Sequence, residues 1–296
     1  MTTTTTDPSY VDPALVNPRA VRLIEAFKDA LARLRDEEGL TFDDVYAVTD
    51  VLQQIQTATG APLALVAMPM YSEIFQGGRD GYTPSEDVTS PTYLPGSQRI
   101  DNPGTLPMRP DEPGTPLIVS GRVLDGNGEP LAGARLEIYH AASNGNYSGL
   151  YDDGVPKDNL RGHLFTDDDG RYTFTTTTPA AYADEHVVAI KQAVEATAAL
   201  GRSLYRPAHI HYEVHHPDLI ATWTGEVYFK GDPVIPVDFV GSKLAHPRLQ
   251  ADTELHEDAR DIAAAGFEVP YRTMEFDFHL KTRTSPATLP SQTVTA

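Results

Sequence analysis

The chain has 296 residues, of which 40% are apolar and 22% are charged, and these values are ordinary for a globular protein. Its formal net charge of −19 argues against nucleic acid and against an anionic membrane surface as partners. The sequence contains no cysteine. Disulfides, thiolate metal sites and cysteine nucleophiles are therefore excluded, and any metal must be held by nitrogen and oxygen atoms.

The first twelve residues are rich in threonine, and residues 1–12 are predicted to be a flexible tail. They have neither the basic start nor the apolar run of a secretion signal. No stretch of the sequence approaches the roughly 20 apolar residues that a membrane-spanning helix needs. We therefore expect a cytoplasmic protein with no membrane partner.

Residues 13–77 are predicted to form a small helical unit. The segment from Asn17 to Gly39 starts with a good helix cap, carries apolar residues at three- and four-residue steps and ends in a helix-stopping glycine. Residues 41–60 repeat this pattern, and residues 61–75 form a third, almost wholly apolar candidate. The apolar stripes need a partner, which is another part of the chain or a second copy of it.

Residues 78–281 are predicted to form an antiparallel β-sandwich, which makes the fold mixed but mainly β. The segment begins with a long connection rich in Gly, Pro, Ser, Thr and Asp. Several short strands with turn signals between them follow, among them the Asp-rich turn at 167–170. A helical excursion is expected within residues 184–207, and residues 282–296 are expected to be a disordered tail.

The stretch "YRPAHIHYEVHHPD", residues 205–218, contains four of the ten histidines. Side chains two apart on a strand point to the same side, so His209 and His211 face one place. Taken alone, His-x-His is more often part of a polar strand face than of a metal site.

Three stretches together resemble the intradiol ring-cleavage dioxygenases: residues 119–153, 159–182 and 206–214. They contain, in order, G-x-Y-S, P-x-x-Y and R-P-A-H-I-H, and this ordered set is far more specific than His-x-His. The helical N-terminal unit is similar to that of the catechol and hydroxyquinol 1,2-dioxygenase branch. The resemblance implies cleavage of a catechol with O2 to a cis,cis-muconate.

The resemblance also implies one mononuclear non-haem Fe(III) per subunit, with Tyr147, Tyr182, His209 and His211 as ligands. Tyr151 is a rival for Tyr147, but the spacing from the preceding histidine favours Tyr147. Ferric iron is a hard cation that prefers anionic oxygen donors, which ionised tyrosines supply. A free tyrosine has a pKa of about 10, and a bound trivalent ion would lower it far enough to ionise the phenol.

Further residues are assigned by the same resemblance. Arg206 would stabilise negative charge on the substrate ring, and Tyr182 would leave the metal and accept a catechol proton. Glu226, the third catalytic candidate, stands where the family often has glutamine. Its carboxylate could pair with Arg206, become protonated or point elsewhere. The substrate-binding set is Val88, Pro91, Thr92, Arg206, Phe239 and Val240, with Tyr93 beside it.

Three alternatives remain open at this point. A hydroxyquinol 1,2-dioxygenase would use the same centre and give maleylacetate or 3-hydroxymuconate. A two-histidine, one-carboxylate Fe(II) site would use Glu226 as its carboxylate. A non-enzymatic β-sandwich binding module would also carry strands of this kind.

The resemblance further implies a homodimer formed through the N-terminal helices, with a lipid bound there.

Overall fold

The computed structural model describes residues 17–59, 80–85, 90–150, 154–183, 185–199, 201–238 and 247–289. The chain divides into two compact units, residues 1–53 and 54–296, and each is considered by itself. The predicted boundary at residues 77 and 78 and the predicted third helix lie outside the described residues. None of the helices in the described residues combines the length and the hydropathy that a membrane span requires.

The two predicted N-terminal helices are present as α1 (Pro18–Glu38) and α2 (Phe42–Thr59). Asn17 caps α1, because its Oδ1 accepts hydrogen bonds from two N–H groups of the first turn. Gly39 ends α1 with a φ of +72°, a left-handed conformation that suits glycine. No residue of α1 is buried.

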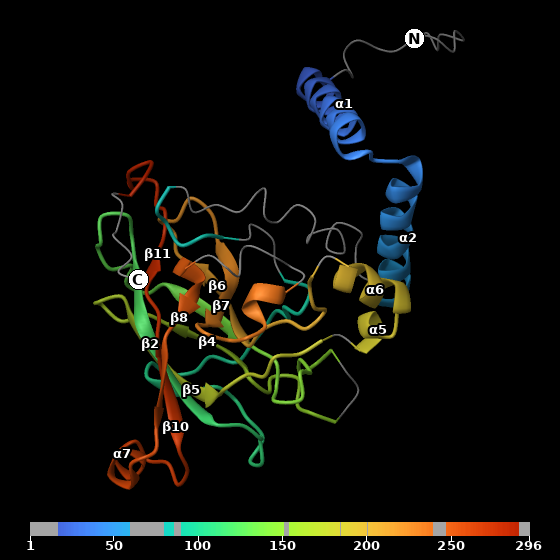
Figure 1. Cartoon of the computed structure of the whole chain (residues 1–296). Coiled ribbons are helices and arrows are strands. Elements are labelled where there is room, and N and C mark those ends of the chain that lie inside the picture. Colours follow the sequence, from blue (N-terminus) through green and yellow to red (C-terminus); the bar gives the residue numbers. More distant parts are fainter. Residues whose placement is uncertain are drawn as a thin grey trace, which may run out of the picture. The chain divides into compact units, whose positions relative to one another are not determined.

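The remaining elements are mostly strands, arranged in two sheets (Figure 1). The first sheet contains β1 (Gly104–Thr105), β2 (Pro116–Leu124), β5 (Arg171–Thr177), β9 (Thr253–His256), β10 (Tyr271–Glu275) and β11 (Phe278–His279). The second contains β3 (Arg135–Tyr139), β4 (Arg161–Phe165), β6 (His209–His215), β7 (Trp223–Phe229) and β8 (Gln250–Ala251). The helical elements are α5 (Glu185–Val188), α6 (Lys191–Ala199), η2 (Ile235–Val237), η4 (Pro247–Leu249) and α7 (Ala259–Ala264).

The predicted fold class, mainly β with N-terminal helices, is confirmed, and α5 and α6 lie in the predicted helical excursion. The sheets are mixed rather than wholly antiparallel. Most long pairs are antiparallel, but β10 and β11 run parallel to β2, β1 runs parallel to β5, and β8 runs parallel to β7. These parallel pairs join segments far apart in the sequence or short edge strands, which a local pattern does not encode.

The Asp-rich turn at 167–170 is present, but it does not close a β-hairpin. Oδ1 of Asp167 accepts hydrogen bonds from the N–H groups of Asp169 and Arg171. The strands on either side, β4 and β5, nevertheless belong to different sheets. The turn therefore carries the chain from one layer of the sandwich to the other.

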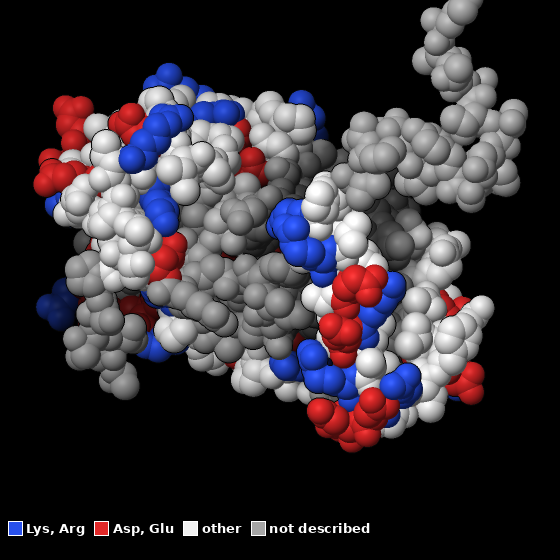
Figure 2. Space-filling model, turned by 90° about the horizontal axis from the view of Figure 1, so that it is seen from above, with Lys and Arg blue, Asp and Glu red and all other residues white. Residues whose placement is uncertain are grey.

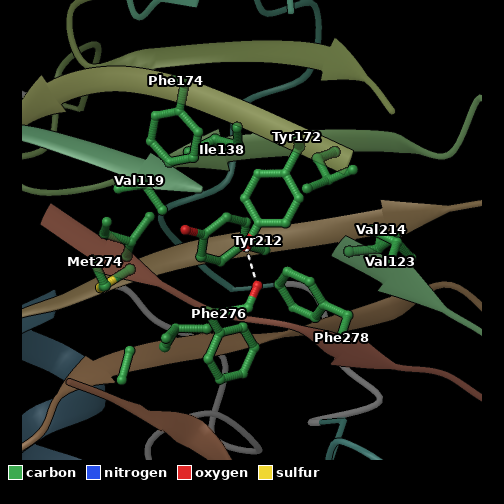
Figure 3. Close-up of a cluster of buried hydrophobic side chains, with 14 of the residues drawn as sticks. Val119, Val123, Ile138, Tyr172, Phe174, Tyr212, Val214, Met274, Phe276 and Phe278 are labelled. Carbon is green, nitrogen blue, oxygen red and sulfur yellow. Dashed lines mark hydrogen bonds between the residues drawn. The ribbon is translucent and has the colours of Figure 1, made fainter. Parts of the chain in front are cut away.

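Apolar side chains from both sheets fill the space between them (Figure 3). Val119, Tyr172 and Phe174 come from the first sheet, and Ile138 and Tyr212 come from the second. All five are at most 1% exposed. Each strand of the second sheet points one set of alternate residues into this core, so the residues between them face outward. The outward face of the second sheet carries the candidate site.

Residues 282–289 pack against the sandwich, although the sequence predicts a disordered tail from residue 282. Leu289 is buried, and its N–H donates to the carbonyl of Asp80 over 2.6 Å. The hydroxyl of Tyr82 donates to the carbonyl of Pro286 over 2.6 Å. These contacts are made with a segment about 200 residues earlier, so the tail's own composition does not reveal them.

Charged side chains of both signs lie interspersed on the described part of the face seen in Figure 2. The net charge of −19 thus arises without a purely acidic surface on this side.

Candidate metal centre

Two histidines at the start of β6 face away from the sandwich core. Strand alternation places Ile210 and Tyr212 in the core and turns His209 and His211 to the other side. Both imidazoles are nonetheless buried, at 2% exposure each, and their Nε2 atoms lie 3.2 Å apart. The same-face geometry expected from the spacing is therefore present in a site shielded from water.

Tyr147 reaches these histidines from a tight turn that follows β3. The N–H of Ala142 donates to the carbonyl of Asn146 over 2.9 Å, which closes the turn. The Tyr147 side chain then points inward and is buried. Its Oη lies 3.1 Å from Nε2 of His209 and 3.0 Å from Nε2 of His211.

Tyr182 completes the cluster from the segment after β5. Its Oη lies 3.3 Å from Oη of Tyr147, and the two rings meet edge to face with centroids 5.6 Å apart. Gly145, in the turn before Tyr147, has a φ of +87°, and a Cβ there would lie 2.6 Å from Cβ of Tyr182. Glycine is thus required both for the left-handed turn and for the close approach of the second tyrosine.

A hydrogen bond donated by His209 and a carboxylate close to His211 turn the lone pairs of the two Nε2 atoms toward Tyr147. Nδ1 of His209 donates to the carbonyl of Pro207 over 2.7 Å, which leaves Nε2 unprotonated in the neutral ring. Nδ1 of His211 lies 3.6 Å from Oε1 of Glu226, and this carboxylate favours a proton on Nδ1. The Tyr147 hydroxyl has one proton and can donate it to only one of the two Nε2 atoms. The remaining lone pairs of the two Nε2 atoms and of the Tyr147 oxygen point into one small volume. Two nitrogens and an oxygen arranged in this way fit a metal cation.

Burial controls the ionisation of Tyr147. Removal from water raises the pKa of Tyr147 well above its ordinary value, and the neighbouring Tyr182 raises it further. The phenol is therefore neutral at physiological pH in the protein alone. A bound multivalent cation would ionise it, because the ion would be the largest charge in the site.

Arg206 is held between two buried carboxylates beside this cluster. Its Nη2 lies 2.6 Å from Oε2 of Glu226, and its Nε lies 3.2 Å from Oδ2 of Asp238. Nη2 also donates to Oη of Tyr228 over 3.1 Å. Burial opposes the charge of Arg206, but Glu226, Tyr228 and Asp238 outweigh it and raise the pKa of Arg206 well above its ordinary value. The guanidinium is a fixed positive charge.

Register explains why these groups meet. His211 on β6 is the partner of Glu226 on β7, and His209 is the partner of Tyr228. Partners across antiparallel strands share a face. The predicted pairing of Glu226 with Arg206 is present, since the carboxylate reaches sideways to the guanidinium.

Of the predicted pocket residues, Thr92 lies beside the cluster, with Oγ1 3.5 Å from Nε2 of His211. Pro91 is exposed to solvent. Tyr93 packs against Tyr139, with ring centroids 5.8 Å apart. Three predicted pocket residues and the rival ligand lie outside the described residues: Val88, Phe239, Val240 and Tyr151. Their roles stay predictions.

Four buried residues of the site were not identified from the sequence: Tyr139, Arg161, Tyr228 and Asp238. The ring of Tyr139 stacks on that of His211, with centroids 4.7 Å apart and planes 7° apart. Alternation could have revealed Tyr228, because Glu226-x-Tyr228 mirrors His209-x-His211 on the neighbouring strand. No local pattern marks Asp238.

Comparison with known proteins identifies the family. A family described as "Dioxygenase" matches residues 88–282, which is more than half of the chain. The chain belongs to this dioxygenase family. The predicted family, the intradiol ring-cleavage dioxygenases, and the predicted enzyme class are thereby confirmed, and a non-enzymatic binding module is disfavoured.

The relatives of this dioxygenase differ in substrate. It is 32% identical over 232 residues to catechol 1,2-dioxygenase 1 of Acinetobacter lwoffii, covering 75% of this chain and 73% of the relative. It is 36% identical over 159 residues to hydroxyquinol 1,2-dioxygenase of a Rhizobium species, covering 53% and 51%. The structure of 3-chlorocatechol 1,2-dioxygenase from Rhodococcus opacus superposes with a TM-score of 0.69 at 25% identity, covering 89% of this chain and 98% of that one. These relatives are named for three different substrates, namely catechol, hydroxyquinol and 3-chlorocatechol.

Proposed function

We propose that this dioxygenase cleaves catechol, or a substituted catechol, with O2 to a cis,cis-muconate at a non-haem Fe(III) ion, one per subunit. The observation that supports this most strongly is the convergence of two phenol oxygens and two imidazole nitrogens. Each donor atom of Tyr147, Tyr182, His209 and His211 lies within 3.3 Å of another member of the set.

The donor set suits ferric iron. Fe(III) prefers hard anionic oxygens, and two phenolates supply them, while neutral imidazoles are accepted by many transition metals. The hydrogen bond from His209 to Pro207 fixes the ring nitrogen that would bind the ion. With two phenolates and two neutral imidazoles, the ligands would offset two of the three positive charges of the ion.

The competing ligand set of His209, His211 and Glu226 fits less well. These three side chains do place possible ligand atoms within 4.8 Å of one another. The carboxylate, however, already accepts hydrogen bonds from Arg206 and Tyr228. The nitrogen of His211 that approaches Glu226 is Nδ1, whereas Nε2 faces the phenol of Tyr147. We therefore assign the oxygen ligands to the tyrosines and place Glu226 beside them.

Bound Fe(III) would supply a Lewis-acidic centre that takes the two catechol oxygens and makes the ring reactive toward O2. Tyr147, His209 and His211 are buried and would keep their donor atoms in place. Tyr182 is partly exposed, so its Oη is the ligand atom that an incoming substrate can reach. We assign Oη of Tyr182 as the base that accepts a catechol proton.

Arg206 would act on the substrate ring rather than on the metal, and Glu226 would act through Arg206. The guanidinium is fixed by Glu226 and Asp238, so it would present a preorganised positive charge where negative charge develops on the ring. Glu226 would orient Arg206 and set the net charge of the pair.

A panel of substrates tests the proposal. The Fe(III)-loaded protein should be reddish, because phenolate-to-Fe(III) charge transfer absorbs visible light. Catechol, methylcatechols, chlorocatechols and hydroxyquinol should each be offered, with O2 uptake and ultraviolet absorbance of the product recorded. Uptake of one O2 per catechol with muconate formation is the expected result. Preference for hydroxyquinol, with maleylacetate or 3-hydroxymuconate as product, would favour that alternative, and a colourless iron-loaded protein would overturn the ligand assignment.

We also propose a cytoplasmic homodimer formed through the N-terminal helices, with a lipid bound between them. Apolar side chains of α1 are exposed in the single chain, among them Leu23, Ile24 and Phe27, at 56%, 55% and 60%. An apolar face of this kind needs a cover. Sedimentation velocity of the wild type and of Phe27→Asp tests the dimer, since the variant should shift toward monomer. Mass spectrometry of extracted material tests the lipid.

A further inference from the structure

A buried arginine, Arg161, lies at one end of a row of side chains that crosses the second sheet. Arg161 on β4 is the register partner of Tyr139 on β3, Tyr139 is the partner of His211 on β6, and His211 is the partner of Glu226 on β7. Register partners on antiparallel strands share a face. The row therefore has a cation at one end, a carboxylate at the other and a proposed metal ligand between them.

Hydrogen bonds fix the guanidinium of Arg161 to two backbone segments of the site. Its Nε donates to the carbonyl of Ser148 over 3.1 Å and lies 3.0 Å from Oγ of the same residue. Its Nη1 donates to the carbonyl of Thr92 over 2.8 Å. Ser148 follows Tyr147 directly, and Oγ1 of Thr92 contacts His211. One side chain thus ties the turn of one proposed ligand to a segment that contacts another.

The same guanidinium lies over two aromatic rings. Its Cζ is 5.2 Å from the centroid of Tyr139 and 5.9 Å from the centroid of Tyr147. These distances are within the range of cation–π attraction. Because Tyr139 stacks on His211, Arg161 supports the His211 ring through Tyr139 and faces the Tyr147 ring directly.

Arg161 is a costly residue to keep at this position. It is 3% exposed, it has no ion pair among the described residues, and its Nη2 is buried without a hydrogen-bond partner there. Leu160 before it adopts a φ of +58°, which is unfavourable for a residue with a branched side chain. A buried cation held by carbonyls and ring faces, next to a strained residue, is a feature that often marks a functional site.

We propose that Arg161 is a positioning residue for the metal centre: it holds the Tyr147 turn and the His211 ring in place and sets a positive charge against the Tyr147 ring. This role rests on the proposed function. Its consequence is that Arg161 controls both how tightly the metal is held and the energy of the phenolate orbital that gives the protein its colour.

Two substitutions separate the two effects. Arg161→Gln removes the charge, and we expect iron affinity to fall by about 10–100-fold, as for other groups that support metal ligands. The charge-transfer maximum should move to longer wavelength, because loss of a nearby cation raises the energy of the phenolate donor orbital. Arg161→Lys keeps a charge but lacks the planar fork. It should show a smaller shift of the band while still losing affinity.

Arg99→Gln is the matched control, because the guanidinium of Arg99 lies over the ring of Phe165 at 5.0 Å and contacts none of the proposed ligands. It should leave affinity and colour unchanged. Iron affinity by chelator competition, the visible spectrum and circular dichroism should be recorded for each protein. If the Arg161 variants do not fold, Tyr139→Leu carries the test, since it removes the ring between Arg161 and His211 and should also weaken iron binding.

A folded Arg161→Gln variant with wild-type iron affinity and an unshifted charge-transfer band overturns this inference alone. Where Tyr139→Leu carries the test, a folded Tyr139→Leu variant with wild-type iron affinity does the same. A wild-type protein that shows no phenolate band with Fe(III) overturns the proposed function as well. The two failures are therefore distinguishable.

Discussion

Tyr182 and Arg206 exchange two backbone hydrogen bonds, with the N–H of Tyr182 3.1 Å from the carbonyl of Arg206 and the N–H of Arg206 2.6 Å from the carbonyl of Tyr182. This isolated bridge fixes the partly exposed phenol next to the segment that leads into His209 and His211. The proposed base, the proposed ring-stabilising cation and two proposed ligands thus share one rigid backbone frame. Precise placement of this kind is what a site with several cooperating groups requires.

Tyr147→Phe should abolish iron retention and the visible colour. The variant keeps the ring but removes the Oη that lies 3.1 Å and 3.0 Å from the two histidine nitrogens. Tyr271→Phe is a matched control, because the ring of Tyr271 also lies beside that of a histidine, His256, outside the site. Metal analysis and visible spectra of the purified proteins decide the matter. Full colour in Tyr147→Phe would show that this residue is not a ligand.

Arg206→Ala should keep the iron and the colour but lower kcat by about 10²–10³-fold, the usual effect of removing a group that stabilises developing charge. It should also lower the free energy of unfolding by about 3–5 kcal/mol, because Glu226 and Asp238 stay buried without their counter-charge. Steady-state kinetics and urea unfolding measure the two effects. Arg202→Ala, a few residues earlier on the same segment, is the control, and wild-type kcat in Arg206→Ala would contradict the role.

Glu226→Gln distinguishes a supporting carboxylate from a metal ligand. The amide oxygen can still accept hydrogen bonds from Arg206 and Tyr228, so we expect iron and colour to be retained. Stability should fall by about 1–3 kcal/mol, the cost of losing a charge-assisted hydrogen bond. Loss of iron with both tyrosines intact would instead support the two-histidine, one-carboxylate site. Metal content and urea unfolding of the same preparation provide both readings.

Some residues of this site can be predicted from local sequence patterns, and others cannot, because tertiary pairing places them. Strand alternation alone places His209 and His211 on one face, because the period of a strand is fixed. The approach of Tyr147 depends on a turn some 60 residues earlier, and only the ordered motifs of a family resemblance connect the two. Arg161 begins a strand whose partner is set by register, so its contact with Ser148 and its place over the aromatic rings follow from tertiary pairing. The parallel pairing of β10 with β2 cannot be predicted from local sequence for the same reason.

The two core tyrosines in Figure 3 should respond differently to loss of the hydroxyl. Oη of Tyr172 donates to the carbonyl of Phe276 over 2.7 Å, whereas Oη of Tyr212 is buried with no hydrogen-bond partner among the described residues. Tyr172→Phe should therefore lower the free energy of unfolding by about 1–2 kcal/mol, whereas Tyr212→Phe should leave it unchanged or raise it. Urea unfolding of both variants measures the difference. Equal losses would contradict this account of the core.

His140 should make the protein sensitive to acid. Its Nδ1 donates to the carbonyl of Ala141 over 2.8 Å, its Nε2 accepts from the Thr176 hydroxyl over 2.7 Å, and the ring is buried. Burial lowers the pKa of His140 from 6.5 to about 4. Between these values the unfolded chain binds a proton that the folded protein does not, so stability is fully present above pH 6.5 and is lost as the pH falls toward 4. The loss amounts to about 3 kcal/mol.

His140→Gln removes the group that titrates and should flatten this part of the pH profile. Urea unfolding at intervals from pH 4 to pH 8 gives the free energy of unfolding for both proteins. The variant can be less stable throughout, because it loses the hydrogen bond to Thr176, so the comparison is between slopes. Above pH 7 the two profiles should run parallel, and below pH 6.5 the wild type should fall more steeply. Parallel profiles over the whole range would show that His140 is not the group responsible.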